Sequence, residues 1–382
     1  MRISSFLALA LLSAYCGAAE RPVDRRAAYA AASEALASHK EGEPGLSVAL
    51  DRVWSAVAEW TSGYLDEHPA ATAEPLASAV AELDPAHLSV TAVRLTGLPA
   101  TFAVAANYPK SGTFFVIARA KDGHFRPMWN IKDLARRRYA SRDEIGYWAW
   151  NGNSWGDGPA TGRVGPLPPS ASGQARFYVD AVAAAEAGGT FRKQFSVWEW
   201  GGAVARPLFI ESYQASFDTD PVTVGAGAVR IPMKGSYKSF STCGACPEPR
   251  MLRTLRVAGD GVHDLGTVDA QPELRCVDDL WDRLIHSQDG GNLATPQVVA
   301  ALRPVVEEIK RGAGTRLDVS LGMLEDSTIK EENGHRDLLV SADALDCKQL
   351  RFEIRASPRD RCLRAVRVID TCRDQTGSAM KR

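Results

Sequence analysis

The sequence predicts a multi-region α+β protein with N-terminal helices, a central all-β region and a C-terminal domain of two helices and an antiparallel sheet. Three observations support this class. Apolar residues recur at three- and four-residue steps near the start, and they alternate with polar residues between glycine turns in the middle. Two further helical stripes precede four strand-like segments near the end. A chain of 382 residues is long enough to bury more than one core.

The first residues have the composition of an export signal. Arg2 precedes an apolar run over residues 6–14, and small residues up to Ala19 offer a cleavage site before Glu20. This run is shorter than the about 20 apolar residues that a membrane span needs, and no other segment qualifies. We therefore predict a signal peptide over residues 1–19 and a protein that is periplasmic or secreted.

The seven cysteines agree with export. Cleavage after Ala19 would remove Cys16 and leave six, an even number that suits an oxidising compartment. A lipoprotein anchored through Cys16 is the less favoured alternative, because the bulky Tyr15 stands where a small residue is expected.

The charge balance excludes one class of partner. The chain carries 45 Lys and Arg against 46 Asp and Glu, a net charge of -1. A near-neutral balance gives no electrostatic basis for binding nucleic acid.

Residues 20–86 are predicted to be helical. An alanine-rich helix over residues 25–37 comes first, and a shorter helix over residues 76–83 comes last. Between them an amphipathic stripe runs from Leu46 to Tyr64, with Gly45 before it and His68-Pro69 after it. Proline cannot continue the hydrogen-bond ladder, so this helix ends at His68.

Residues 87–271 are predicted to be all-β. A loose unit of three strands recurs three times, with glycine turns near Gly123, Gly202 and Gly261. This pattern favours propeller-like or meandering antiparallel sheets. A Gly-, Pro- and Ser-rich surface loop separates the first two units. The predicted strands are residues 101–108, 111–120 and 124–129, then 175–182, 194–200 and 205–213, then 228–237, 251–257 and 262–268.

Residues 272–372 are predicted to form the α+β domain, followed by a polar tail over residues 373–382. One helical stripe covers residues 274–285, and a second covers residues 298–309 after Thr295 as N-cap and Pro296 as first helical residue. Four strand candidates follow at residues 317–324, 336–343, 348–356 and 362–370, with a polar turn over residues 325–334.

Cys243 and Cys246 have the spacing of thiol–disulfide enzymes. Those enzymes place the first cysteine at a helix N-terminus, which stabilises the thiolate. Here Pro247 and Pro249 follow, and then a strand-like segment. We therefore predict a disulfide that staples a turn, and a catalytic pair remains the alternative.

The other four cysteines fit a bridged final domain. A hairpin whose turn is centred on Arg359 and Asp360 would place Cys347 opposite Cys372. The prediction is then Cys347–Cys372 with Cys276–Cys362, although a turn with Pro358 at its second position would shift this register.

Motifs for metal, nucleotide or nucleophilic chemistry are absent from the sequence. None of the seven histidines has metal-ligand spacing, and there is no GxSxG elbow or Walker loop. We therefore expect no metal and no cofactor, although a catalytic triad is defined by geometry and can escape a sequence pattern.

Tryptophans give the main hint of binding. Trp148 and Trp150 would share one face of a strand, Trp155 follows in the loop, and Trp198 and Trp200 repeat the pairing. Exposed indoles form flat platforms for sugars or peptides, whereas buried ones fill a core. Core packing is the favoured interpretation because tryptophan is usually buried.

Three classes of function remain. The favoured one is an exported, non-catalytic binding or structural protein whose ligand is a protein, peptide or carbohydrate. The alternatives are an envelope thiol–disulfide protein that uses Cys243 and Cys246, and a hydrolase whose site is assembled from distant residues.

Overall fold

A computed structural model describes most of the chain. Within the described residues, three helices are followed by twelve strands, two helices and four strands, which confirms the predicted α+β class. The described residues are 24–39, 45–98, 100–108, 111–131, 162–185, 190–216, 221–225, 227–235, 238, 250–270, 272–313, 330–332, 335–341, 348–355 and 363–370.

The N-terminal helices are α1 (Arg25–Ala37), α2 (Leu46–Glu67) and α3 (Ala73–Ala81). The carboxylate of Asp24 caps α1 by accepting hydrogen bonds from the backbone N–H groups of Arg26 and Ala27. Most of the apolar stripe predicted for α2 is buried, and Trp60 and Tyr64 toward its end are partly buried. These helices therefore form where periodicity and punctuation predict them.

Three four-stranded sheets follow, and each is an antiparallel meander in chain order. The predicted strands of each unit are present, but each sheet also has a first strand that the sequence pattern missed: β1, β5 and β9. The strands of the first sheet are β1 (Ser89–Arg94), β2 (Thr101–Tyr108), β3 (Ser111–Arg119) and β4 (Phe125–Asn130). Those of the second are β5 (Gly162–Leu167), β6 (Ala175–Ala185), β7 (Thr190–Trp200) and β8 (Ala205–Ser216). Those of the third are β9 (Thr223–Gly225), β10 (Ala228–Lys234), β11 (Arg250–Ala258) and β12 (Gly261–Asp269).

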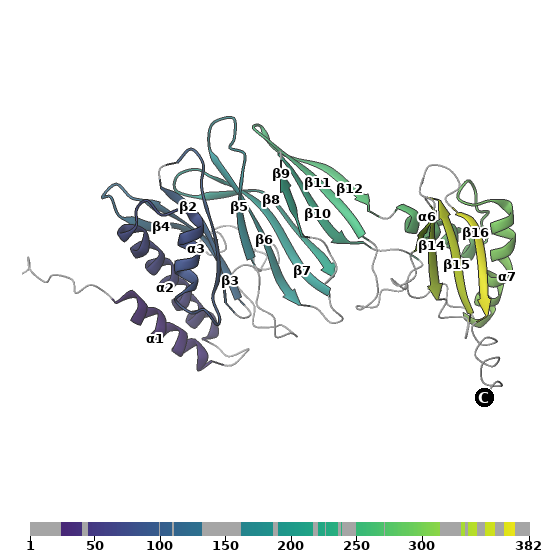
Figure 1. Ribbon diagram of the computed structural model, residues 1–382, viewed down its shortest axis with the longest axis horizontal. Helices are drawn as coiled ribbons and strands as arrows, with labels where there is room; N and C mark the ends of the chain where they lie inside the picture. Colours follow the sequence, from purple (N-terminus) through teal and green to yellow (C-terminus); the bar gives the residue numbers. More distant parts are fainter. Residues whose placement is uncertain are drawn as a thin grey trace, which may run out of the picture.

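The helices and the three sheets are stacked as layers, with a core between each neighbouring pair (Figure 1). The helices cover one face of the first sheet, whose other face packs on the second sheet, and the second sheet packs in turn on the third. Strand β2 is accordingly buried on both faces. The core between helices and first sheet includes Val53, Trp54, Val57, Phe102, Phe115 and Ile117. The next core includes Phe114, Trp129, Phe177, Val179, Trp198 and Trp200. The last includes Phe195, Val197, Tyr213, Val229, Ile231 and Leu255.

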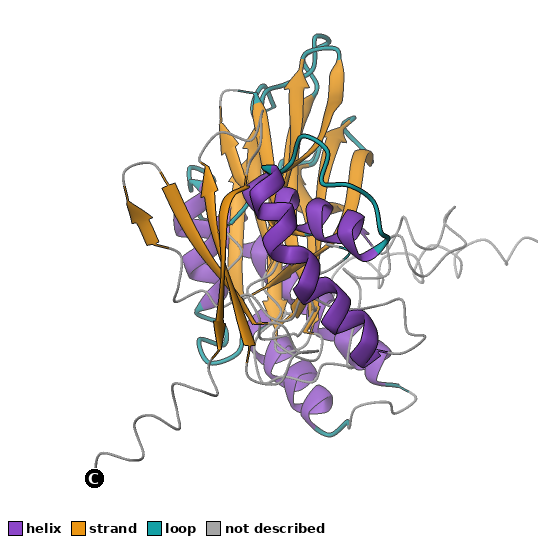
Figure 2. Cartoon of the chain, turned by 90° about the vertical axis from the view of Figure 1, so that its right-hand side faces the viewer, coloured by secondary structure: helices purple, strands orange, loops and turns teal. Residues whose placement is uncertain are grey.

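The C-terminal unit begins with α6 (Pro272–Ile285) and α7 (Pro296–Ala313). Its sheet has the order β13-β14-β15-β16, and α7 contacts β16. Figure 2 shows both helices on one side of this sheet. The strands are β13 (Lys330–Glu332), β14 (His335–Ser341), β15 (Lys348–Arg355) and β16 (Leu363–Asp370).

Two expectations for this sheet need correction. Strand β13 lies inside the run 325–334 that the sequence predicted as a turn, and the strand predicted at residues 317–324 lies outside the described residues. In addition, Lys348 pairs with Asp370, which shifts the hairpin by one residue from the register that would set Cys347 directly opposite Cys372. The register of a hairpin depends on its turn type, and the segment that joins these two strands in the sequence includes Pro358.

None of the helices in the described ranges is both long enough and apolar enough to cross a bilayer.

Candidate functional site

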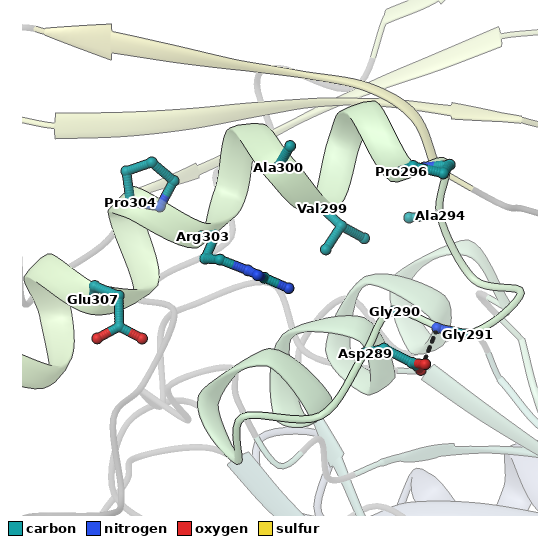
Figure 3. Close-up of a pocket in the computed structure, with 10 residues that line it drawn as sticks. All are labelled: Asp289, Gly290, Gly291, Ala294, Pro296, Val299, Ala300, Arg303, Pro304 and Glu307. Carbon is teal, nitrogen blue, oxygen red and sulfur yellow. Dashed lines mark hydrogen bonds between the residues drawn. The ribbon is translucent and has the colours of Figure 1, made fainter.

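A pocket of about 680 Å³ lies in the C-terminal unit, between α7 and the connection that leads into it (Figure 3). Its two walls come from residues close in sequence. One wall is a face of α7 that carries Pro296, Val299, Arg303 and Glu307. The other is the turn that begins at Asp289.

Helix α7 presents two distinct faces, which explains why the pocket forms on it. Val298, Leu302, Val305 and Val306 recur at three- and four-residue steps and are buried. The residues between them, at the steps 296, 299, 303 and 307, point to the opposite face. Arg303 and Glu307 are exposed there, and Val299 is half-buried.

The start of α7 is fixed by the cap that the sequence predicted. The backbone N–H of Val298 donates to Thr295 Oγ1 at 3.3 Å, and Pro296 is the first helical residue. This cap sets where the helix begins and therefore which residues face the turn.

The turn packs closely on α7 because it contains two glycines. A Cβ on Gly290 would lie 2.6 Å from Val299 Cγ2 and 3.1 Å from Leu280 Cδ1, so a larger residue cannot approach in this way. Gly291 has a φ of 55°, in the left-handed region that favours glycine. Asp289 Oδ1 accepts a hydrogen bond from the Gly291 N–H at 3.0 Å and holds the turn in place.

The pocket combines apolar lining residues with a few charged ones. Val299, Arg303 and Glu307 project from the side of α7 that faces the Asp289 turn (Figure 3). Within the described part of the chain, the guanidinium of Arg303 has neither a hydrogen-bond nor an ion-pair partner. Pro304 has no N–H to donate to the carbonyl of Ala300, and both residues line the pocket. The site thus offers a planar cation with five donors beside apolar side chains.

A second polar cluster joins α1, the turn after α3 and the end of β2. Tyr29 donates a hydrogen bond to Asp84 Oδ2 at 3.1 Å, and His87 Nδ1 lies 3.0 Å from Asp84 Oδ1. Ser33 Oγ and the Tyr108 hydroxyl are 3.2 Å apart, and the rings of His87 and Tyr108 are 5.7 Å apart between centroids. Asp84 can orient the imidazole, as carboxylates do in catalytic dyads. Sequence reasoning missed this cluster because its members come from three elements.

Burial and the neighbouring Asp84 carboxylate raise the pKa of Tyr29 above its usual value of 10. The raised pKa means that the folded state holds the phenol proton more tightly than the unfolded chain does. Its contribution to stability is therefore complete below about pH 10 and is lost as the pH rises above it. Above pH 10, the unfolding free energy of the wild-type protein should fall more steeply with pH than that of Tyr29→Phe. The difference between the two slopes should be up to about 1.4 kcal/mol per pH unit. Urea unfolding of both proteins at pH 8 and pH 11 measures this difference. Equal losses of unfolding free energy in the two proteins would contradict the prediction.

The tryptophans predicted as a platform are only partly described. Trp198 and Trp200 are buried in the core between the first two sheets, so they offer no exposed face. This corrects their assignment as platform residues and agrees with the core interpretation. Trp148, Trp150 and Trp155 lie outside the described residues.

The cysteine predictions fall mostly outside the described residues as well. Cys276 is the one cysteine in the described ranges, and it is disulfide-bonded. Its partner is not described, so Cys276–Cys362 stays a prediction. The bonds Cys243–Cys246 and Cys347–Cys372 lie outside the described residues and stay predictions as well.

Metal chemistry finds no support among the described side chains. No group of three or more His, Cys, Asp or Glu side chains in those ranges is placed to hold a metal ion.

Comparisons of the chain with family models, with curated proteins and with solved structures find no match. Any function must therefore be argued from the geometry of the molecule.

Proposed function

We propose that the chain is an exported, non-catalytic binding protein, and that the α7 pocket holds a small ligand with a carboxylate beside an apolar group. One observation carries the proposal: Arg303, a cation without a partner in the described chain, lines a pocket of about 680 Å³ together with apolar residues. Pockets of this size that combine apolar walls with few polar groups are typical of ligand sites. The composition of residues 1–19 supports export.

The guanidinium favours a carboxylate for geometric reasons. Its planar fork of N–H groups matches two carboxylate oxygens, and such charge-assisted pairs are stronger than neutral hydrogen bonds. Because Arg303 is exposed, water screens the pair and its strength is modest. The apolar lining residues Val299, Ala300 and Pro296 supply the remaining affinity by covering an apolar part of the ligand.

The acidic residues of the pocket restrict the ligand further. Asp289 and Glu307 line the same space as Arg303. A ligand with two or more negative charges would meet both carboxylates, whereas a monoanion can pair with the guanidinium and keep away from them. The charges therefore favour a single carboxylate, as at the end of a peptide or on an aromatic acid.

The test uses N-benzoylglycine, a monoanion with an aromatic body, and its methyl ester as the neutral analogue. We expect calorimetric titration to show about threefold to fivefold weaker binding for the ester, because an exposed ion pair contributes up to about 1 kcal/mol. Arg303→Leu should lose a similar factor for the acid and nothing for the ester. Arg311→Leu is the matched control, because Arg311 is also exposed on α7 but does not line the pocket.

Equal binding of acid and ester by the wild-type protein would contradict the role of Arg303. No binding of either probe at millimolar concentration would contradict the site itself.

The two alternative functions make different demands. A thiol–disulfide protein needs a reducible Cys243–Cys246 pair, which lies outside the described residues. The contact between Asp84 and His87 is the observation that supports the hydrolase alternative, because a carboxylate can orient an imidazole that acts as a general base. Among the described residues, however, His87 has no hydrogen bond to a hydroxyl that could serve as nucleophile. The binding function is therefore preferred.

A further inference from the structure

The charged residues of the α7 pocket alternate in sign along its length. Arg303 and Glu307 both line it from α7, and four residues of a helix advance about 6 Å along the axis. Asp289 belongs to the opposite wall. Its neighbour Gly290 packs on Val299, which lies one turn before Arg303 on α7. The guanidinium of Arg303 therefore has a carboxylate about one helical turn away on either side.

These three charges do not neutralise one another. Within the part of the chain that the structure describes, Arg303 forms no ion pair with Asp289 or with Glu307. Side chains on a helix lean toward its N-terminus, and Arg303 accordingly points away from Glu307 and toward the side of the Asp289 turn (Figure 3). A cation and a carboxylate on opposite walls are thus left for a ligand to join.

The two carboxylates differ in the partners that they already have. Glu307 Oε1 lies 3.9 Å from Lys310 Nζ, which also donates a hydrogen bond to Ser287 Oγ at 2.8 Å. Asp289 Oδ1 accepts from the Gly291 N–H, whereas its Oδ2 has neither a hydrogen-bond nor an ion-pair partner in the described ranges. Asp289 is therefore the acid that is both held in direction and open to a ligand.

A further cation, Arg283 of α6, lies behind the Asp289 turn. Its Nη1 is 2.6 Å from the position that a Cβ on Gly291 would occupy. Arg283 is half-buried, does not line the pocket and makes no ion pair with Asp289 among the described residues. Its charge weakens the attraction of Asp289 for a bound cation, and we therefore expect that attraction to be modest.

We propose that the α7 pocket binds a free α-amino acid with a large apolar side chain. The α-carboxylate pairs with Arg303, and the α-ammonium group donates to Asp289 Oδ2. The side chain of the ligand lies against Val299 and Ala300, which line the pocket. This inference rests on the proposed binding function and adds to it the positive group that the ligand carries.

The dimensions of an α-amino acid suit this arrangement. Standard bond lengths place its ammonium nitrogen about 2.5 Å from its carboxylate carbon. A hydrogen bond of about 2.9 Å at each end extends the reach to about 8 Å between protein groups. This reach exceeds the advance of about 6 Å over four residues of α7. One amino acid can therefore join groups that are separated by one helical turn.

The charge of the lining also favours an amino acid over a simple acid. The charged lining residues are one cation, Arg303, and two carboxylates, Asp289 and Glu307. A simple monoanion brings another negative charge to the two carboxylates and nothing positive. An amino acid at pH 7 carries both charges, because its carboxyl group is ionised and its amino group is protonated. Its positive end offsets the excess of acid in the pocket.

The test compares phenylalanine with 3-phenylpropanoate, which lacks only the ammonium group, by calorimetric titration of the full mature chain. Asp289→Asn removes the charge and keeps an oxygen that accepts from the Gly291 N–H. We expect this variant to shift the affinity ratio about threefold to fivefold toward 3-phenylpropanoate, as suits an exposed ion pair. Comparing ratios between wild type and variant cancels the different hydration of the two ligands.

The remaining acid and the cation of the pocket provide the controls. Glu307→Gln should shift the ratio by less than about twofold, because Lys310 already stands beside this carboxylate. Arg303→Leu should weaken both acids alike, by about threefold to fivefold. Thermal unfolding of each variant checks the fold. Asp289→Ser, whose hydroxyl can also accept from the turn, replaces Asp289→Asn if that variant does not fold.

The outcomes separate this inference from the proposed function. An unchanged ratio in Asp289→Asn, while wild type binds both acids, would overturn the amino-acid assignment and leave the proposed function standing. An equal shift in Glu307→Gln and Asp289→Asn would overturn the role of Asp289. Failure of the wild-type protein to bind either acid at millimolar concentration would overturn both proposals.

Discussion

Replacing Trp198 with alanine should lower the free energy of unfolding by about 3–5 kcal/mol. Trp198 is almost completely buried between the first two sheets. Its ring centroid lies 5.1 Å from that of Phe114 and 5.5 Å from that of Trp129, both in the first sheet. Removing the indole leaves a cavity that two facing sheets cannot close easily, because each is held by its own hydrogen-bond ladder.

A hydrogen bond adds to the effect of Trp198. Its Nε1–H donates to Ser196 Oγ at 2.8 Å, so the polar atom of this buried ring is satisfied. Trp198→Phe keeps an aromatic ring but loses this bond, and should cost less than alanine does. Urea unfolding at pH 7 measures all three proteins.

The matched control is Met128→Ala, which truncates an exposed side chain next to Trp129 and should change stability by no more than about 0.5 kcal/mol. A cost below about 1 kcal/mol for Trp198→Ala would show that this core does not join the two sheets.

Glu199→Gln should destabilise the protein by about 3–5 kcal/mol at pH 7, because it leaves a buried guanidinium without its counter-charge. Arg176 and Glu199 are only 4% and 5% exposed, and Arg176 Nε lies 3.0 Å from Glu199 Oε2. Arg176 also donates hydrogen bonds to the carbonyls of Ala258 and Gly259. The pair therefore links the second sheet to the β11–β12 turn of the third.

The same pair makes stability depend on acid. Burial by itself would raise the pKa of Glu199, but the hydrogen bonds and charges of Arg206 and Arg176 outweigh it and lower the pKa below 4.5. A lowered folded pKa means that this contribution is present above pH 4.5 and is lost as the pH falls through the folded pKa. Wild type and Glu199→Gln should therefore become more alike in unfolding free energy between pH 5 and pH 3.

Arg206→Gln is the control for this prediction. Arg206 contacts the same carboxylate but is 69% exposed, so its loss should cost no more than about 1 kcal/mol. If Glu199→Gln and Arg206→Gln lower the free energy of unfolding by equally small amounts, the buried Arg176–Glu199 pair does not hold the two sheets together.

The fold class was predictable because it depends on local patterns. The stripe along α2, the apolar runs of β2 and β3, and the cap at Thr295 each involve residues within a few positions of one another. Strands β1, β5 and β9 were not predicted because their own residues give only a weak strand pattern. Gly165 and Pro166 interrupt β5, and Gly165 is explained only by the Tyr178 ring, which would lie 2.2 Å from a Cβ there.

The sequence by itself determined the secondary-structure class, the helix boundaries and most strands of this protein, together with the expectation of export. Only the tertiary structure decided which faces are covered. Alternation shows that Trp198 and Trp200 share a strand face, but not that another sheet lies over it. Likewise, Arg303 looks like an ordinary solvated charge in the sequence, and only the structure places it in a pocket. Periodicity is a property of neighbouring residues, whereas burial and the pairing of charges depend on segments that the chain brings together from a distance.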